Sequence, residues 1–272
     1  MRILFLGLGV VASLYLSVIA GLYVFQDHLI FAAGMSNQFS EKTSLADFDE
    51  VSFVASDGIT LSGLYAKARP GRPSFLFFHG KGGTVFSRKP LLLQLRNYGF
   101  GVLAFEYRGF GKNKGIASEK LFVQDNVLGY DFLLRQGVDA SQIIILGESL
   151  GTNVAVDLAA KRGVGALILL SSMSSLKDIA QHRYPFVPVA FLIKHPFRSD
   201  LKIGRVKAPF LALHGTNDQR VPLKFARDLF KKAPEPKEFY EVVGAGHNNL
   251  YEFPVVEEMV RFIKAHKIAY FN

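Results

Sequence analysis

The hydrophobic pattern begins with one long uncharged segment at the N-terminus. Between residues 3 and 25 the chain holds only aliphatic, aromatic and small or hydroxylic residues. As a helix, a run of this length can cross the roughly 30 Å hydrocarbon core of a bilayer. A signal peptide cleaved near residues 18–20 and a buried core helix are alternatives, although the run continues past that small-residue site and has no polar face. We predict a transmembrane anchor at residues 1–26 and a connector at residues 27–50.

The rest of the chain alternates between short apolar runs and longer helical ones. Two β-rich runs meet at Asp57-Gly58, which is the signal of a two-residue hairpin turn. Continuous apolar runs then predict strands that are buried on both faces. The predicted hairpin strands are 51–56 and 59–66, the buried strands 74–78, 101–105, 143–146, 166–170 and 210–213, the last strand 238–243, and the helices 87–98, 118–136, 150–162 and 251–267. This order is typical of an α/β domain, here residues 51–272, with a mostly parallel, doubly wound sheet and an antiparallel N-terminal hairpin.

One segment, residues 172–205, interrupts the alternation. It is long for a connection between a strand and a helix, and it contains the apolar stretch YPFVPVAFLI at residues 184–193. Loops of this length in compact domains are usually functional. We predict a small helical cap over a site, with a surface excursion or a second membrane contact as alternatives.

Charge and composition narrow the possible partners. The 272 residues carry a formal charge of +9, but Lys and Arg are scattered and no nucleic-acid motif accompanies them. This suits a membrane surface and argues against nucleic-acid binding. The chain has no cysteine, which excludes disulfides, thiolate catalysis and cysteine-based metal sites. Arg2 before the apolar run and acidic residues after it favour a cytoplasmic N-terminus and an extracytoplasmic location of the domain at 51–272, in a periplasm or lumen.

The residues GESLG at 147–151 match the pattern Gly-x-Ser-x-Gly, which is common by chance but here stands between a predicted strand and a predicted helix. A nucleophile elbow requires that setting, because the glycines permit the tight turn that holds the serine exposed at its tip. The helix that begins beyond Ser149 also favours negative charge developing there. We predict Ser149 as a nucleophile; the alternative is an ordinary small-residue turn.

A serine hydroxyl needs a base to take its proton and a carboxylate to orient that base. Among the seven histidines, His247 lies in a glycine-bearing loop after the last strand, which can turn the imidazole back toward the sheet edge. Asp218 lies just past the strand at 210–213. The alternatives are a solvated loop histidine and a helix N-cap before Pro222. We predict Ser149, Asp218 and His247 as the catalytic residues, in a chain order that neither common serine protease class shares.

A glycine-rich loop, HGKGG at residues 79–83, follows the strand at 74–78 and can bring backbone N–H groups to a developing oxyanion. We predict that the oxyanion hole uses the N–H groups of Leu150 and Lys81, with Gly82 as second choice to Lys81. A phosphate cradle is excluded because the order Gly-x4-Gly-Lys-Ser/Thr is absent. His79 and His214 each follow a strand and precede a glycine, so we interpret both as loop anchors.

Taken together, HG at 79–80, EYRGFG at 106–111, the GESLG turn, GH at 246–247 and the loop at 214–222 that holds Asp218 (the acid loop) resemble the α/β-hydrolase-domain family. The apolar leader with LIF at 29–31, and YPFVP at 184–188, are similar to its bud-emergence-related, membrane-anchored branch. The resemblance implies the α/β-hydrolase fold and a serine hydrolase that cleaves an ester, thioester or lipid acyl bond without a cofactor or metal. Its substrate would be a small-molecule or lipid-like acyl compound.

Two positions depart from the family pattern. Glu106 stands where relatives commonly have aspartate, and Lys81 stands where they commonly have asparagine. The backbone donor survives the second change, and we hypothesise that the cationic Lys81 side chain at the site rim favours anionic substrates. A peptidase or amidase of the same fold is the alternative activity, and a non-catalytic membrane-tethered scaffold is a third hypothesis. No feature of the sequence determines the oligomeric state.

Overall fold

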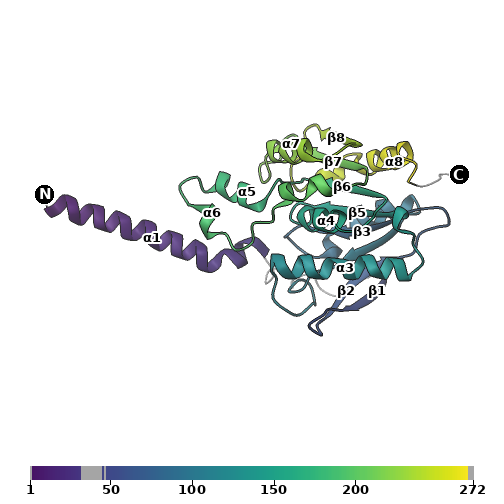
Figure 1. Cartoon of the computed structure of the whole chain (residues 1–272), viewed down its shortest axis with the longest axis horizontal. Helices are drawn as coiled ribbons and strands as arrows, with labels where there is room; N and C mark the ends of the chain where they lie inside the picture. The colour runs from purple at the N-terminus through teal and green to yellow at the C-terminus, as the bar shows by residue number, and fades with distance from the viewer. Residues whose placement is uncertain (1, 32–44, 46, 269–272) are drawn as a thin grey trace.

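An eight-stranded sheet forms the centre of the molecule in the computed structural model, which describes residues 2–31, 45 and 47–268 (Figure 1). The strands lie in the order β1-β2-β4-β3-β5-β6-β7-β8. Their bounds are β1 (Asp49–Val54), β2 (Thr60–Ala66), β3 (Ser74–Phe78), β4 (Gly101–Phe105), β5 (Ile143–Glu148), β6 (Ala166–Leu170), β7 (Phe210–Gly215) and β8 (Lys237–Val242). The β1–β2 and β2–β4 pairs are antiparallel, and every other pair is parallel. The predicted mostly parallel sheet with an antiparallel hairpin is confirmed.

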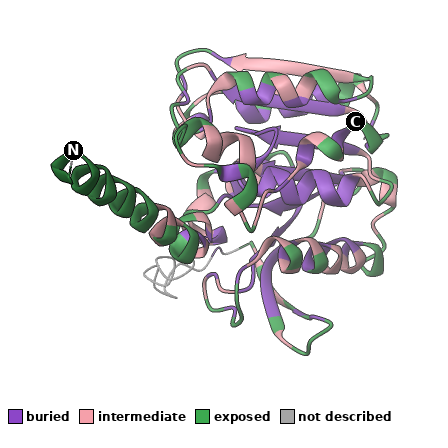
Figure 2. Ribbon diagram, turned by 60° about the vertical axis from the view of Figure 1, so that its left-hand side comes forward, coloured by how far each residue is buried: buried purple, intermediate pink, exposed green. Residues whose placement is uncertain are grey.

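Helices cover both faces of this sheet, as the continuous apolar strands require. Alternate side chains of β3 point to opposite faces, with Leu76 and Phe78 in one hydrophobic cluster and Phe75 and Phe77 in the other. The helices of the first cluster are α3 (Glu119–Arg135), α4 (Gly151–Ala159) and α7 (Leu223–Lys232), and those of the second are α2 (Lys89–Asn97) and α8 (Val255–Ala265). Figure 2 shows the central strands and the buried helix α4 against them as the most buried part of the molecule, whereas the edge strands β1 and β8 are partly exposed.

The sequence analysis missed one of these helices, α7. Half of its residues are charged, and only Phe225, Ala226 and Leu229 are buried. Their spacing places them on one face of a helix, and Pro222 directly before Leu223 is compatible with a helix start. In a short run in which half of the residues are charged, the hydrophobic periodicity was too weak to predict this helix.

The N-terminal helix α1 (Arg2–Phe31) projects from the domain (Figure 1). Residues 2–18 are all exposed, and none of the most apolar window is buried, so the core-helix interpretation is wrong. The helix has the length and composition of a membrane span, which a signal sequence shares. It continues beyond residue 26 to the buried Phe31, while residues 32–44 and 46 of the predicted connector lie outside the described part of the chain.

The predicted cap segment leaves the sheet after β6 and returns before β7. It holds α5 (Leu176–Arg183), α6 (Val189–Leu192) and two short 3-10 turns, Ser199–Leu201 and Ile203–Arg205. A β-bridge between Ser175 and Arg198 closes its base. The segment therefore forms a small helical excursion beside the carboxyl ends of β6 and β7.

Candidate active site

Ser149 lies at the tip of a tight turn between β5 and α4. Its φ of 50° is in the left-handed region, which non-glycine residues rarely adopt. A Cβ at position 147 would lie 2.7 Å from the Cα of Thr152, and one at position 151 would lie 2.1 Å from the carbonyl oxygen of Phe78. Both glycines are therefore needed so that helix α4 can start directly against the strands.

Replacing Gly151 by alanine is expected to destabilise the fold by about 3 kcal/mol or more, because backbone atoms of β3 cannot move away from the added methyl group. Thermal unfolding in detergent measures this loss. Gly163→Ala is the matched control, since a Cβ there would meet nothing within 4 Å. Equal unfolding temperatures for the two variants would contradict this account of the turn.

The three residues predicted as catalytic come together in space. The Nε2 atom of His247 lies 3.0 Å from the hydroxyl oxygen of Ser149, and its Nδ1 atom lies 2.7 Å from the carboxylate of Asp218. The second oxygen of Asp218 accepts hydrogen bonds from the backbone N–H groups of Arg220 and Val221. The carboxylate orients the imidazole, so the unprotonated Nε2 can accept the serine proton.

The surroundings of Asp218 keep it ionised. Burial raises the pKa of its carboxyl group, but the hydrogen bond and charge of His247 and the Val221 N–H outweigh burial and leave the pKa below its usual value. His214 lies behind it, with Nε2 donating to the Val221 carbonyl at 2.8 Å and 3.4 Å from the Asp218 carboxylate. His214 thus holds the acid loop, in agreement with its interpretation as a loop anchor.

Burial lowers the pKa of His214, which outweighs the opposite effects of the Val221 carbonyl and of Asp218. The folded chain therefore binds this proton more weakly than the unfolded chain does. Stability is expected to fall as the pH drops below the ordinary histidine pKa of about 6.5. His214→Gln, which keeps a side-chain N–H, is expected to reduce the loss of unfolding temperature between neutral and mildly acidic pH. An unchanged loss in this variant, or an equal reduction in the exposed-residue control His182→Asn, would contradict the assignment.

The predicted oxyanion loop follows β3 and lies beside Ser149. Within the described residues, neither the N–H of Lys81 nor that of Leu150 donates to a protein acceptor, so both are available to a ligand. His79 braces the loop, with one ring nitrogen 2.7 Å from the Gly80 carbonyl and the other 2.8 Å from Glu106. The second carboxylate oxygen of Glu106 accepts the N–H of Val85 at 3.0 Å, so the glutamate that departs from the family pattern spans both ends of the loop.

An ion pair that the sequence analysis did not identify lies next to the nucleophile. Two nitrogens of Arg88 donate to the two carboxylate oxygens of Glu148 at 2.8 and 2.9 Å, and a third contacts the Gly82 carbonyl at 2.5 Å. Burial raises the pKa of Glu148, but Arg88 outweighs this and leaves it below its usual value. Arg88 therefore joins the end of β5 to the oxyanion loop. The sequence did contain a signal for this pair: Glu148 stands inside the elbow motif, and a buried carboxylate requires a partner.

A cavity of about 1340 Å³ reaches Ser149 and His247. Its walls come from the oxyanion loop, the cap and, unexpectedly, the last turns of α1, including Leu22 and Leu29. The amine of Lys81 donates to the Leu29 carbonyl at 2.9 Å, and burial and then the charge of Arg220 lower its pKa. Lys81 therefore links the site to the N-terminal helix as well as lining its rim.

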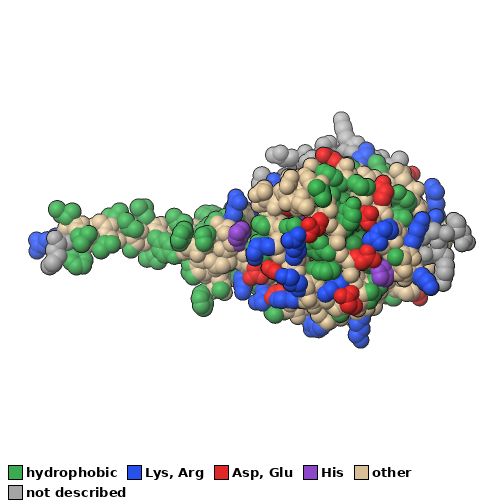
Figure 3. Space-filling model, turned by 90° about the horizontal axis from the view of Figure 1, so that it is seen from above, with side chains coloured by type: hydrophobic (Ala, Val, Ile, Leu, Met, Phe, Trp, Pro, Cys, Tyr) green, Lys and Arg blue, Asp and Glu red, His purple; other side chains and the backbone are tan. Residues whose placement is uncertain are grey.

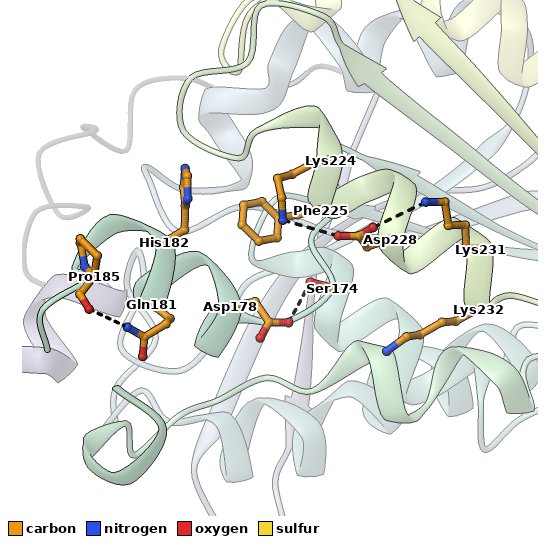
Figure 4. A pocket seen from close by; sticks show the side chains of 10 residues that line it. All are labelled: Ser174, Asp178, Gln181, His182, Pro185, Lys224, Phe225, Asp228, Lys231 and Lys232. Atoms are coloured by element: carbon orange, nitrogen blue, oxygen red, sulfur yellow. Dashed lines mark hydrogen bonds and ion pairs between the residues drawn. The ribbon is translucent and has the colours of Figure 1, made fainter. Parts of the chain in front are cut away.

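A second hollow, of about 710 Å³, lies between α5 and α7 (Figure 4). Its charged groups have partners. Lys224 and Lys231 lie 3.6 and 3.9 Å from Asp228, Lys232 lies 3.3 Å from Asp200 outside the hollow, and Ser174 donates to Asp178 at 3.0 Å. Neither Ser149 nor His247 lines it. The hollow is therefore separate from the candidate active site.

Comparison with known proteins identifies the family and agrees with the fold. The family model described as serine aminopeptidase, S33, matches residues 69–204, half of the chain. The chain belongs to the α/β-hydrolase family. This hydrolase is 34% identical over 244 residues to an uncharacterized protein of Mycobacterium tuberculosis, covering 89% of this chain and 87% of the relative. The narrower resemblance to the bud-emergence-related branch stays a prediction.

Solved structures share the fold of this hydrolase at low sequence identity. An α/β hydrolase of Vibrio vulnificus superposes with a TM-score of 0.74 at 20% identity, covering 88% of this chain and 92% of that one. An esterase of Pyrococcus furiosus superposes with a TM-score of 0.64 at 17% identity, covering 83% and 95%. Both predictions of fold and family are confirmed.

Proposed function

We propose that this hydrolase is a membrane-anchored serine esterase or acyl hydrolase, which cleaves an ester, thioester or lipid acyl bond through an acyl-Ser149 intermediate. The observation that carries the proposal is the pair of contacts on His247, 3.0 Å to Ser149 and 2.7 Å to Asp218. Esterases among the structural neighbours point the same way. The activity uses no cofactor and no metal ion.

The reaction follows from these contacts. As the Ser149 oxygen attacks the acyl carbon, its proton passes to Nε2 of His247, and Asp218 stabilises the imidazolium. The N–H groups of Lys81 and Leu150 stabilise the oxyanion. The tetrahedral intermediate collapses, the leaving group takes the proton from Nε2, and the acyl group stays on Ser149. A water molecule then gives its proton to His247 and attacks the ester, which releases the acid and restores the Ser149 hydroxyl.

In the same proposal, residues 1–26 anchor the chain, 27–50 connect, and 51–272 form the catalytic domain. Figure 3 shows hydrophobic side chains along the projecting helix and many Lys and Arg side chains on the globular part. Arg2 on the far side of the apolar run favours a cytoplasmic N-terminus, so that the catalytic domain faces the periplasm or lumen.

A fluorophosphonate probe tests the nucleophile directly, since it reacts covalently with an activated serine. The full chain in detergent is expected to be labelled at Ser149, and Ser149→Ala is expected to take no label while keeping its unfolding temperature. A folded wild-type chain that takes no label at Ser149 would leave the non-catalytic scaffold as the better hypothesis.

An amidase or aminopeptidase activity is the second candidate, because the matching family model carries that description. An aminopeptidase must pair a substrate ammonium group with a free carboxylate. In this cavity Glu148 is held by Arg88, and Glu252 is the other carboxylate among the lining residues. The further cations Lys81, Arg183 and Arg220 outnumber it. This charge favours neutral or anionic acyl groups. Hydrolysis of a chromogenic ester but not of an aminoacyl amide supports the first proposal, and the reverse preference supports the second.

Lys81→Met is expected to lower kcat/KM about fivefold more for an ester that carries a carboxylate than for a neutral ester, because the cation is lost from the rim while the backbone donor remains. Lys81→Arg keeps the charge and serves as the control. Equal losses for the two esters in Lys81→Met would show that the amine acts only through its contact with the Leu29 carbonyl.

A further inference from the structure

Two phenylalanines at the tip of the cap are left in contact with solvent. Phe186 is 85% exposed and Phe191 is 90% exposed. Outside α1, these are the two most exposed large hydrophobic side chains among the described residues. Each such side chain left in water costs about 1.5–3 kcal/mol relative to an apolar environment, so their joint exposure points to an apolar partner.

The cap tip is tied to α1 at two levels. The hydroxyl of Tyr15 donates to the Phe186 carbonyl at 2.7 Å. Eleven positions further along the helix, the buried Gln26 donates to the Leu192 carbonyl at 3.1 Å and accepts the N–H of Lys194 at 2.7 Å. At 1.5 Å per residue the cap therefore follows α1 over about 16 Å of its length. Figure 1 shows α6 beside the half of this helix that lies nearer the globular domain.

The continuously exposed part of α1 is shorter than the hydrocarbon core of a bilayer is thick. Residues 2–18 are exposed, and as a helix they rise about 25 Å, whereas the hydrocarbon core is about 30 Å thick. If α1 spans the membrane, the first turns that contact the domain must also enter the hydrocarbon. Tyr15 is bound to the cap tip, so the tip enters with them.

Most polar backbone groups of the turn at 184–188 are hydrogen-bonded within the protein, as an environment without water requires. The amide of Gln181 donates to the carbonyls of Tyr184, Pro185 and Val187 at 3.4, 3.3 and 3.2 Å, and Tyr15 satisfies the Phe186 carbonyl. Two of the five residues in the turn at 184–188 are prolines without an N–H group. Within this described turn, only the N–H of Phe186 lacks a protein acceptor. Irregular backbone at membrane depth must satisfy its polar groups internally in this way.

Positively charged side chains lie at the edge of the apolar cap tip. The cap segment, residues 172–205, holds six Lys and Arg side chains against two Asp. Lys194 lies at the base of the tip, 4.8 Å above the ring of Tyr23, and the exposed Arg183 ends α5. Cations above an apolar surface suit anionic lipid headgroups.

The cavity of the candidate active site is lined by both elements. Leu22 and Tyr23 of α1 are among its lining residues, and so are Tyr184, Val187 and Leu192 of the cap. We infer that the cap tip and α1 form one bilayer-embedded surface, and that a long-chain acyl lipid enters the cavity laterally between them. This inference rests on the proposed anchoring by α1 and extends it to the substrate route.

Tryptophan fluorescence tests the depth of the cap, because the chain contains no tryptophan of its own. Single substitutions Phe186→Trp, Phe191→Trp, Val10→Trp and Val54→Trp are made in the full chain. Each protein is reconstituted into vesicles of phosphatidylcholine and phosphatidylglycerol with or without brominated acyl chains. We expect both cap positions to be quenched as Val10→Trp is, and the exposed Val54→Trp on β1 to be unaffected.

The outcomes separate this inference from the anchoring itself. Quenching at Val10→Trp without quenching at either cap position would overturn the embedded cap while leaving the anchor intact. Absence of quenching at Val10→Trp would overturn the anchor and the embedded cap together.

A kinetic measurement tests the lateral route. The double substitution Phe186→Asp with Phe191→Asp is expected to lower kcat/KM about tenfold for a long-chain ester diluted in vesicles. It is expected to leave a water-soluble butyrate ester within about twofold, because neither side chain lines the cavity. Val54→Asp is the control. Equal losses on both substrates would mean that the tip serves folding alone, and no loss on the vesicle substrate would overturn the route.

Discussion

Replacing Ser149 by alanine is expected to lower kcat for a neutral acyl ester by about 10⁶-fold, a loss of the size measured for other serine hydrolases with the same three side chains. The substitution removes the oxygen that forms the acyl intermediate. The remaining groups, the two oxyanion N–H donors and His247, can only assist a direct attack by water. The measurement is single-turnover and steady-state hydrolysis of a chromogenic ester by full-length protein in detergent.

Ser172→Ala is the matched control for this loss. Ser172 is also a buried serine, two positions past the end of β6, and its hydroxyl has no protein partner among the described residues. This variant is expected to keep full activity. If Ser149→Ala retained more than about one hundredth of the wild-type kcat, another nucleophile or a non-covalent route would have to replace the proposed mechanism.

Asp218→Asn is expected to lower kcat by about 10⁴-fold without unfolding the acid loop. The asparagine oxygen can still accept the N–H groups of Arg220 and Val221, which Asp218 binds at 2.9 and 2.8 Å. Its amide nitrogen, however, faces Nδ1 of His247 and favours the tautomer with the proton on Nε2. That tautomer cannot accept the proton of Ser149.

The dependence of activity on pH distinguishes this effect from a general loss of structure. With the carboxylate absent, activity of Asp218→Asn is expected to recover in part at high pH, where hydroxide replaces the base. Asp228→Asn in the separate surface hollow is the control and is expected to change nothing. A wild-type rate in Asp218→Asn would assign the orienting role to another acid.

The elbow and the sheet are the parts that the sequence predicts well. The strands are continuous apolar runs because both of their faces are covered, and that burial is visible in the residues themselves. The two glycines of the elbow follow from the close approach of α4 to β3, which admits no Cβ at position 151. The chain order of Ser149, Asp218 and His247 follows from the order of β5, β7 and β8.

The contacts around the site could not be predicted in the same way, because they join residues that are far apart in the sequence. Arg88 meets Glu148 across 60 residues of chain, and Gln26 meets Lys194 across 168. The hydrophobic pattern near residue 26 is the same for a membrane anchor and for a helix whose last turns line a cavity, so it does not distinguish between them. His214 could be interpreted as a loop anchor, but its place behind Asp218 depends on how the loop after β7 folds back.

The sequence by itself therefore determined the strands of the sheet and most of the helices around it, and it predicted the elbow and the three residues that the structure brings together, because each depends on burial or backbone geometry within a few residues. Only the tertiary structure decided that α1 is both a candidate span and a wall of the cavity, that Arg88 joins the elbow to the oxyanion loop, and that the cap tip lies along α1. These features depend on side chains that are distant in sequence and become neighbours only in the folded chain. The local hydrophobic periodicity therefore cannot predict them.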